Sequence, residues 1–472
     1  MASNGSFRSA TDDKTFEIHK AVFRGDLEAV KHLLEDISNA TISDMHGNTP
    51  LHLAVMLGRK DIIELLLANG AKVNEKNGLG WNSLDEAVCY GDKPTITLLV
   101  QKRLDQAREG LISRRQELVR SLNSLGSFYA ELKWEFHTWV PFLSRLLPSD
   151  VCKIYKTGSC VRLDSTLGDF SGMRWTTGDL SFIFNGEDRQ QTQSLSMLLL
   201  DNIKKEYQRM KMVGSEDVDK NVEEHVNALM SRPVVYANMS TQPIKVTRAQ
   251  AGWFYRVDKE ERVGDYNTAV HDITDMILIS RRRREHLTPE QIQQQEDLRR
   301  RINAGEMSEQ MFKDLEDTGS SLSLPPPPPC EVTWEEYASA PPDSPPHLGR
   351  PMDLKVERRH FKASVCVTEQ CPIELMKLLD ILEAIVPYKH FHKLRQFVGG
   401  KMPPGFPVKL DVPVFPTVTA TVTLQHYESQ EFPPSKFVVP EGYTKAKPKR
   451  KREEEQADDS TGIQSPSDDT QS

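Results

Sequence analysis

The sequence has no apolar run approaching about 18 residues, so no segment is expected to cross a membrane as a helix. It starts with MASNGSFRSATDDK, which lacks the apolar core of a secretory signal. Its six cysteines are scattered over 472 residues, and we expect reduced cytosolic thiols rather than disulfides. The net charge of −8 gives no reason to expect binding to nucleic acid.

The sequence also lacks the motifs of common catalytic and cofactor-binding sites. It contains no P-loop, no GxGxxG after a strand, no HExxH and no GxSxG. Cys366 and Cys371 have no second cysteine pair, which makes them a poor zinc site. We therefore expect no enzyme activity, no cofactor and no metal. An unrecognised enzyme within residues 150–425 is the alternative from another class.

What the sequence does contain is an ankyrin repeat at residues 44–74, with the signature T-P-L-H-x-A at residues 49–54. Thr49 suits a helix N-cap, and Pro50 suits the first helical position, where no backbone N–H is needed. Thr49 and His52 are expected to be structural and to hold the turn by hydrogen bonds, rather than to take part in catalysis.

A shift of about 33 residues, the ankyrin repeat length, reproduces parts of this pattern on both sides. His52 falls on His19 in the preceding unit, and Gly58 falls on Gly91 in the following one. Both flanking units are degenerate, as the outer, capping units of such an array are. The sequence predicts about three ankyrin repeats over residues 15–100.

Ankyrin arrays present their hairpin tips and first helices to a concave groove, where we expect protein partners to bind. The repeat register assigns seven residues to this groove: Met45, His46, Asn48, Met56, Leu79, Trp81 and Tyr90. An exposed Trp81 beside Met and Leu would be a binding hot spot. The alternative is that Trp81 packs on the helix that follows the repeats.

Residues 101–149 are expected to be a helical connector. Within it, residues 128–147 carry an aromatic and aliphatic stripe, interrupted by Pro141. An interfacial membrane helix is one interpretation of this stripe. Burial against the next domain is favoured, because few cationic residues flank the stripe.

The remaining regions predict an α+β domain formed by residues 150–280 and 350–425. Within it, residues 194–212 are expected to form a helix. Residues 281–349 are expected to be a charged helix and a mostly unpacked, disordered Pro-rich linker, in which Trp334 and Tyr337 stand as an isolated patch that could dock elsewhere.

The fold class is therefore multidomain: an N-terminal α-solenoid of ankyrin repeats, a helical connector, and an α+β domain with a disordered Pro-rich insertion. The two ends, a lead over residues 1–14 and a charged tail over residues 426–472, are expected to be disordered. The KPKRKR run at 447–452 leaves nuclear import as a minor alternative, because three glutamates directly after it offset its charge.

Several long segments resemble the ankyrin repeat domain-containing protein 13 family. These are KWEFHTWVPFLSRLLPSD, KIYKTGSCVRLDSTL, MRWTTGDLSFIFNG, YRVDKEERVGDYNTAVHDI, PIELMKLLDILEAIVP and GFPVKLDVPVFPTVTATVT. The resemblance covers about residues 15–425 and implies a G-protein-coupled-receptor chaperone domain after the repeats. EEEQADDS lacks the spacing and the hydrophobic residue of the ubiquitin-interacting motifs that some members carry, which indicates the C-type branch.

The resemblance implies a non-enzymatic chaperone or adaptor for G-protein-coupled receptors, acting on their biogenesis and exit at the cytosolic face of the endoplasmic reticulum. The alternative is a ubiquitin-dependent endosomal trafficking adaptor for membrane receptors, like the family's other branch. In both cases the partners are membrane receptors or other proteins. The expected location is the cytoplasm, with peripheral attachment to the membrane.

Overall fold

The computed structural model of this protein describes residues 16–36, 40–138, 147–171, 174–187, 196–211, 217–240, 243–252, 254–303, 323–342, 344–379, 395, 398–415 and 418–446. The predicted lead at 1–14 and the KPKRKR run lie outside the described residues.

Three helix pairs form the N-terminal part of the described chain. They are α1 (Glu17–Arg24) with α2 (Leu27–Leu33), α3 (Pro50–Met56) with α4 (Lys60–Ala68), and α5 (Ser83–Tyr90) with the start of α6 (Lys93–Ser124). The first helices begin at Glu17, Pro50 and Ser83, one ankyrin repeat length apart. Each pair therefore repeats the previous one in the predicted register.

Two equivalent histidines tie successive repeats together. His19 Nε2 lies 3.1 Å from the carbonyl oxygen of Asn48, and His52 Nε2 lies 3.1 Å from that of Trp81. The N–H of Thr49 donates to His52 Nδ1 at 3.1 Å. Burial lowers the pKa of His52, so a neutral ring that carries its proton on Nε2 satisfies both bonds. The structural role predicted for Thr49 and His52 is confirmed.

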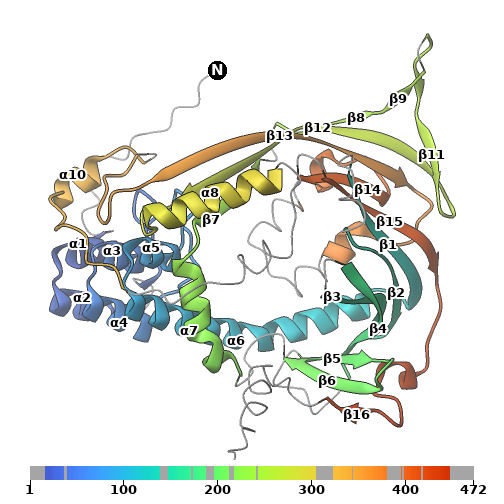
Figure 1. Cartoon of the computed structure of the whole chain (residues 1–472), viewed down its shortest axis with the longest axis horizontal. Helices are drawn as coiled ribbons and strands as arrows, with labels where there is room; N and C mark the ends of the chain where they lie inside the picture. Colours follow the sequence, from blue (N-terminus) through green and yellow to red (C-terminus); the bar gives the residue numbers. More distant parts are fainter. Residues whose placement is uncertain are drawn as a thin grey trace, which may run out of the picture.

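Helix α6 continues beyond the repeats and spans one side of the molecule (Figure 1). Its 32 residues correspond to a length of roughly 48 Å. Beyond its last turn, Lys156 Nζ donates to the carbonyl oxygens of Leu125 and Gly126, which places a cation at the negative end of the helix dipole. The helix ends at Ser124, so the connector expected over residues 101–149 is helical only in its first part.

Residues 128–138 form strand β1 (Phe128–Thr138), and the expectation of a helix there is wrong. The apolar side chains of this segment occupy every second position, which is the period of a strand: Phe128, Ala130, Leu132, Trp134 and Phe136. Phe128, Leu132 and Phe136 are also four residues apart, which is a helical spacing, so the pattern fits both a strand and a helix. Strand β1 pairs along both edges, with β15 and β2, so it lies inside the sheet.

The described part of the chain contains one sheet of fourteen strands in the order β11-β12-β13-β14-β15-β1-β2-β3-β4-β5-β6-β16, with β7 and β8 also paired to β12. All of these pairs are antiparallel except β16 with β6. Besides β1, the strands are β2 (Ser149–Thr157), β3 (Cys160–Ser171), β4 (Arg174–Asn185), β5 (Ser196–Asp201), β6 (Glu206–Lys211), β7 (Val234–Ser240), β8 (Lys245–Arg248), β11 (Glu260–Val263), β12 (Tyr266–Arg283), β13 (Leu354–Thr368), β14 (Phe406–Phe415), β15 (Val418–Glu428) and β16 (Thr444–Lys445).

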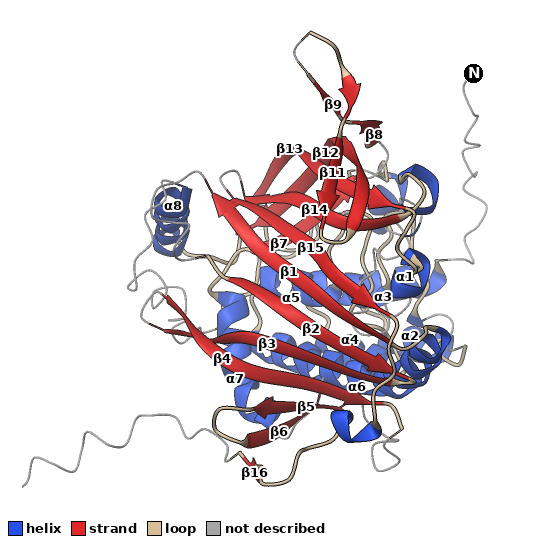
Figure 2. Cartoon of the chain, turned by 90° about the vertical axis from the view of Figure 1, so that its right-hand side faces the viewer, coloured by secondary structure: helices blue, strands red, loops and turns tan. Residues whose placement is uncertain are grey.

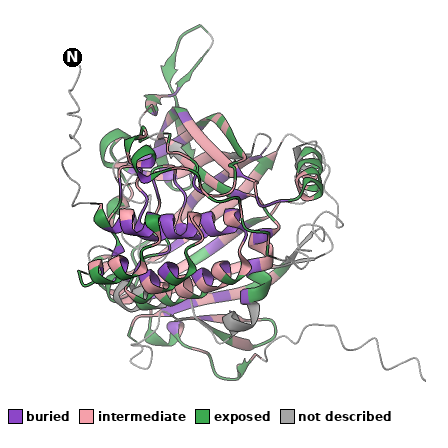
Figure 3. Ribbon diagram, turned by 90° about the vertical axis from the view of Figure 1, so that its left-hand side faces the viewer, coloured by how far each residue is buried: buried purple, intermediate pink, exposed green. Residues whose placement is uncertain are grey.

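The elements follow a closed circuit in Figure 1, with the ankyrin helices on the left, α6 below, the curved sheet on the right, and β12 and β13 returning across the top. Figure 2 faces the sheet and shows its strands crossing the molecule as one continuous surface. Figure 3 faces the ankyrin helices, and the buried residues concentrate in the row of α1, α3 and α5. Helix α7 (Asp217–Met230) packs on the ankyrin core through Val222, Val226 and Met230.

The helix expected over residues 194–212 is also wrong, because β5 and β6 form a hairpin there. Lys205 has a φ of 53° in the turn between them, a left-handed conformation that interrupts regular structure. The run of apolar residues at 197–200 is therefore a strand, and it packs against β4.

The tail expected to be disordered from residue 426 is folded as far as residue 446. Strand β15 continues to Glu428, and the chain then forms the short helix η4 (Pro434–Phe437) and strand β16. Phe437 is only 2% exposed and packs with Ile183 and Leu200. Phe437, together with the partly buried Phe432, Val439 and Tyr443, thus attaches this segment to the sheet.

A core substitution tests the repeat assignment. Leu66 in α4 is fully buried, and Leu66→Ala should lower the free energy of unfolding by roughly 2–5 kcal/mol, because it removes apolar contacts and leaves a cavity. The exposed neighbour Glu64 provides the control, since Glu64→Ala should change stability little. Denaturant unfolding of the full chain measures both variants, and equal stabilities would contradict the assignment.

Candidate functional site

The predicted ankyrin groove is occupied by residues of the same chain. Residues 330–342 and 344–350, called the groove segment here, lie against the hairpin tips and first helices of the repeats. They belong to the region expected to be a mostly unpacked linker, and for these residues that expectation is wrong. The segment contains one helical turn, α10 (Trp334–Ser339), whose capping box pairs Thr333 with Glu336.

Tyr337 is the anchor of the groove segment and is fully buried. Its hydroxyl donates to Asp44 Oδ2 at 2.6 Å and accepts from Asn48 Nδ2 at 2.8 Å. His46 Nε2 lies 2.9 Å from the carbonyl oxygen of Tyr337. Burial, together with the charge of Asp44, raises the pKa of Tyr337, so the hydroxyl keeps the proton that it donates.

Trp334 packs beside Tyr337 and completes an aromatic contact with the first repeat. The ring of Phe23 in α1 lies 5.6 Å from the ring of Trp334 and 5.6 Å from that of Tyr337, measured between centroids. Aromatic pairs at such distances contribute stability beyond the burial of their surface. The Trp334–Tyr337 turn therefore joins repeats one and two by aromatic packing and by hydrogen bonds.

The second half of the groove segment runs across α3 and α5. Leu348 is buried in the ankyrin core. A Cβ atom on Gly349 would lie 3.0 Å from the carbonyl oxygen of Met56, so a side chain there would press on α3. Arg350 Nη2 donates to the carbonyl oxygens of Tyr90 at 3.2 Å and Pro325 at 2.6 Å. These contacts extend the segment to the third repeat.

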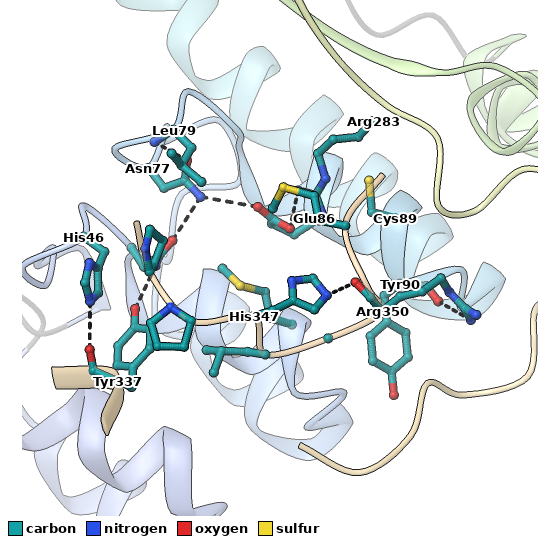
Figure 4. A pocket seen from close by; sticks show the side chains of 17 residues that line it. His46, Asn77, Leu79, Glu86, Cys89, Tyr90, Arg283, Tyr337, His347 and Arg350 are labelled. Atoms are coloured by element: carbon teal, nitrogen blue, oxygen red, sulfur yellow. Dashed lines mark hydrogen bonds and ion pairs between the residues drawn. The ribbon is translucent and has the colours of Figure 1, made fainter. Parts of the chain in front are cut away.

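Between the segment and the repeats lies a pocket of about 50 Å³ (Figure 4). Its walls come from the hairpin tips, from α3 and α5, from residues 345–350 and from Arg283. That volume has room for one or two water molecules but not for a drug-sized ligand. The site is therefore a protein–protein seam closed within one chain.

A buried polar network continues from this seam to the sheet (Figure 4). Asn77 Nδ2 bonds Asn48 Oδ1 at 3.0 Å and Glu86 Oε1 at 3.3 Å. Glu86 Oε2 accepts from Arg283 Nη1 at 2.7 Å, and Glu285 Oε1 lies 2.6 Å from Arg283 Nη2. All three charged side chains are buried. Burial alone would lower the pKa of Arg283, but the two carboxylates outweigh it and raise that pKa.

The structure places the seven predicted groove residues as follows. His46 and Asn48 contact Tyr337, whereas Met56, Leu79 and Tyr90 line the pocket and Met45 packs partly buried against the ankyrin core. Of the two interpretations of Trp81, the exposed one is wrong, because the residue is only 1% exposed. Its ring lies 6.0 Å from that of Tyr236 in β7, and the guanidinium of Arg283 lies 5.4 Å from its centroid.

Sequence reasoning missed Asn77, Glu86 and Arg283. Asn77 could have been found, because the repeat register places it on Asp44. Asp44 Oδ1 accepts from the N–H groups two and four residues ahead, and Asn77 Oδ1 does the same. Arg283 lay within a run of arginines interpreted as the start of a charged helix, but it ends β12.

The described residues contain no group of three or more His, Cys, Asp or Glu side chains placed to hold a metal ion. In the same part of the chain, no helix has both the length and the apolar character needed to span a membrane. What the groove offers chemically is hydrogen bonding and aromatic packing around a helical turn.

The buried ion pair should be strongly coupled. Arg283→Met alone should destabilise the chain by roughly 3–5 kcal/mol, because it leaves the negative charges of Glu86 and Glu285 buried without the positive charge that compensates them. Combining it with Glu86→Leu should cost much less than the sum of the single substitutions. A double-mutant cycle by denaturant unfolding measures this coupling.

Arg284→Met is the matched control for this cycle, since the side chains of its ion-pair partners Glu296 and Asp353 are 50% and 43% exposed. A small effect of Arg283→Met, equal to that of the control, would contradict the role given to the buried network.

Tyr337→Phe should loosen the groove segment. It removes the donor to Asp44 and the acceptor for Asn48, which costs roughly 1–3 kcal/mol. Cleavage by a glutamate-specific protease after Glu335 or Glu336 should become about ten- to a hundredfold faster, because cleavage needs local opening. Ser339→Ala, an exposed change in the same turn, should leave the rate unchanged. Equal rates for Tyr337→Phe and wild type would show that Tyr337 does not hold the segment.

Comparison with known proteins agrees with the two-part architecture. The family model for three ankyrin repeats matches residues 18–109, and the ANKRD13 C-terminal model matches residues 162–469. Ankyrin repeats are protein-interaction modules and indicate protein partners, and neither model belongs to a catalytic family.

Relatives that match most of the chain show its family and its branch. It is 47% identical over 432 residues to ankyrin repeat domain-containing protein 13C of Xenopus tropicalis, which covers 91% of this chain and 83% of the relative. The human 13C protein is 46% identical over 429 residues, covering 91% and 77%. The human 13B protein is 31% identical over 399 residues, covering 80% and 62%. The chain therefore belongs to the ankyrin repeat domain-containing protein 13 family, in its C-type branch.

Proposed function

We propose that this protein is a non-enzymatic chaperone or adaptor for membrane receptors of the G-protein-coupled class. It acts on their biogenesis and exit at the cytosolic face of the endoplasmic reticulum. The observation that carries a binding role is the ankyrin groove, which holds a helical turn by two aromatic anchors, Trp334 and Tyr337. The receptor class and the location are supported by the resemblance to the C-type branch.

In this proposal a client reaches the groove by displacing the groove segment. The residues that would meet the client are those that now hold Tyr337, namely Asp44, His46 and Asn48. The client would present a helical turn with two aromatic residues three positions apart, since i and i+3 side chains lie on one face of a helix. Because the groove segment is tethered, it competes at a high effective concentration, and weak clients are excluded.

We therefore expect stronger client capture when the groove segment is bound less tightly. Full-length protein with Trp334→Ala and Tyr337→Phe should capture more of a detergent-solubilised G-protein-coupled receptor than wild type does, because less free energy is spent on releasing the segment. The receptor bound at equal protein concentration is the measured quantity, and Ser339→Ala is the control.

Two results would count against this proposal. Unchanged or reduced capture by the released variant would exclude the groove as the client site. Capture that depends on ubiquitin attached to the receptor would favour the endosomal adaptor instead.

A further inference from the structure

A small hairpin stands out from the rest of the molecule and takes no part in the groove. It consists of β9 (Gln250–Ala251) and β10 (Val257–Asp258) and lies beyond β8, at the end of the molecule far from the ankyrin helices (Figures 1 and 2). In both views its tip is the outermost point of the described chain on that side.

The base of this hairpin is firmly attached to the sheet. The N–H of Ala249 donates to the carbonyl oxygen of Val270 at 2.9 Å, and the N–H of Val270 donates to that of Lys259 at 3.1 Å. Arg248 Nε lies 3.7 Å from Asp258 Oδ2, and Arg248 Nη2 lies 3.7 Å from Glu260 Oε1, so one guanidinium links two carboxylates of the base. The hairpin is thus attached to β12 through backbone hydrogen bonds at its base.

The tip of the hairpin is made of large apolar side chains in water. Phe254 is 88% exposed, Tyr255 is 85% exposed and Val257 is 63% exposed. Gly252 has a φ of 106°, and a Cβ atom there would collide with the carbonyl oxygen of Tyr255. A backbone turn that needs glycine therefore presents the aromatic residues. Contiguous exposed apolar residues of this kind mark interaction sites.

The charge and shape of the tip indicate what it meets. Between Gln250 and Val257 the only charged residue is Arg256, which is exposed. The tip is a narrow projection, and this shape suits entry into the headgroup layer of a bilayer better than contact with a flat protein surface. Tyrosine prefers the boundary between water and lipid, because it has an apolar ring and a polar hydroxyl. A cation at the same level suits the phosphates of the headgroups.

We propose that the β9–β10 tip inserts Phe254 and Tyr255 into the interface of a phospholipid bilayer, with Arg256 at the headgroup level. The ankyrin helices lie at the far end of the molecule from this tip (Figure 1). The inference supplies a membrane contact for action at the cytosolic face of the endoplasmic reticulum and therefore rests on that part of the proposed function. It does not depend on which client the groove binds.

Flotation of the full chain with protein-free vesicles tests the inference. Wild type should float with phosphatidylcholine vesicles, and more of it should float when phosphatidylserine is added. Phe254→Ala with Tyr255→Ala should reduce partitioning roughly tenfold or more on both vesicle types, because two apolar rings no longer leave water. Arg256→Gln should lose only the increment from phosphatidylserine.

Ile203→Ala is the matched control, since Ile203 is an exposed apolar residue (67%) in the β5–β6 turn. It should float like wild type, and all variants should keep wild-type thermal unfolding because the changed side chains make few contacts. The inference is overturned if wild type floats with neither vesicle type, if the double variant floats like wild type, or if Ile203→Ala loses as much.

Binding only to vesicles that carry membrane proteins would assign the tip to a protein partner and would likewise overturn the inference. Capture of a detergent-solubilised receptor involves no bilayer, so it separates a failure of the tip from a failure of the proposed function. The double variant should retain wild-type receptor capture in detergent.

Discussion

The buried guanidinium of Arg283 joins the two halves of this molecule. It ends the long strand β12, pairs with Glu86 of the third ankyrin repeat and with Glu285, and lies over the ring of Trp81. Burying an ion pair is costly unless its geometry and hydrogen bonding are complete, and here both carboxylates lie within hydrogen-bonding distance of the guanidinium. With α6 on the other side, this contact closes the circuit of elements and fixes the repeats against the sheet.

The same network explains why the groove is closed. Glu86 is linked through Asn77 to Asn48, and Asn48 donates to the hydroxyl of Tyr337. In ankyrin proteins the hairpin tips usually contact a partner. Here they contact the sheet on one side and the groove segment on the other, all within one chain. A groove held in this way is preformed for a partner, but the groove segment must leave before a partner can bind. Such an arrangement sets a threshold affinity for any partner and favours those with aromatic anchors.

The sequence predicted the repeats well, because the pattern at Thr49, Pro50 and His52 reflects local capping and hydrogen bonding within one repeat. It failed where one pattern fits two periods, as at Phe128, Leu132 and Phe136, and where a turn such as that at Lys205 interrupts an apolar run. It could identify the groove residues but not their occupant. Pairing Tyr337 with Asp44 joins residues almost 300 positions apart, and no local pattern reports such a contact.

Amide hydrogen exchange of the unmodified, full-length protein tests the closed groove most directly. The N–H of Tyr337 bonds the carbonyl oxygen of Thr333, and the N–H of Leu324 bonds that of Gly91. If the segment is held as described, peptides covering residues 333–340 exchange slowly, close to the rate of α3, because a single turn of helix has little protection of its own. Exchange of these peptides at the rate of an unstructured chain, with α3 protected, would contradict the closed groove.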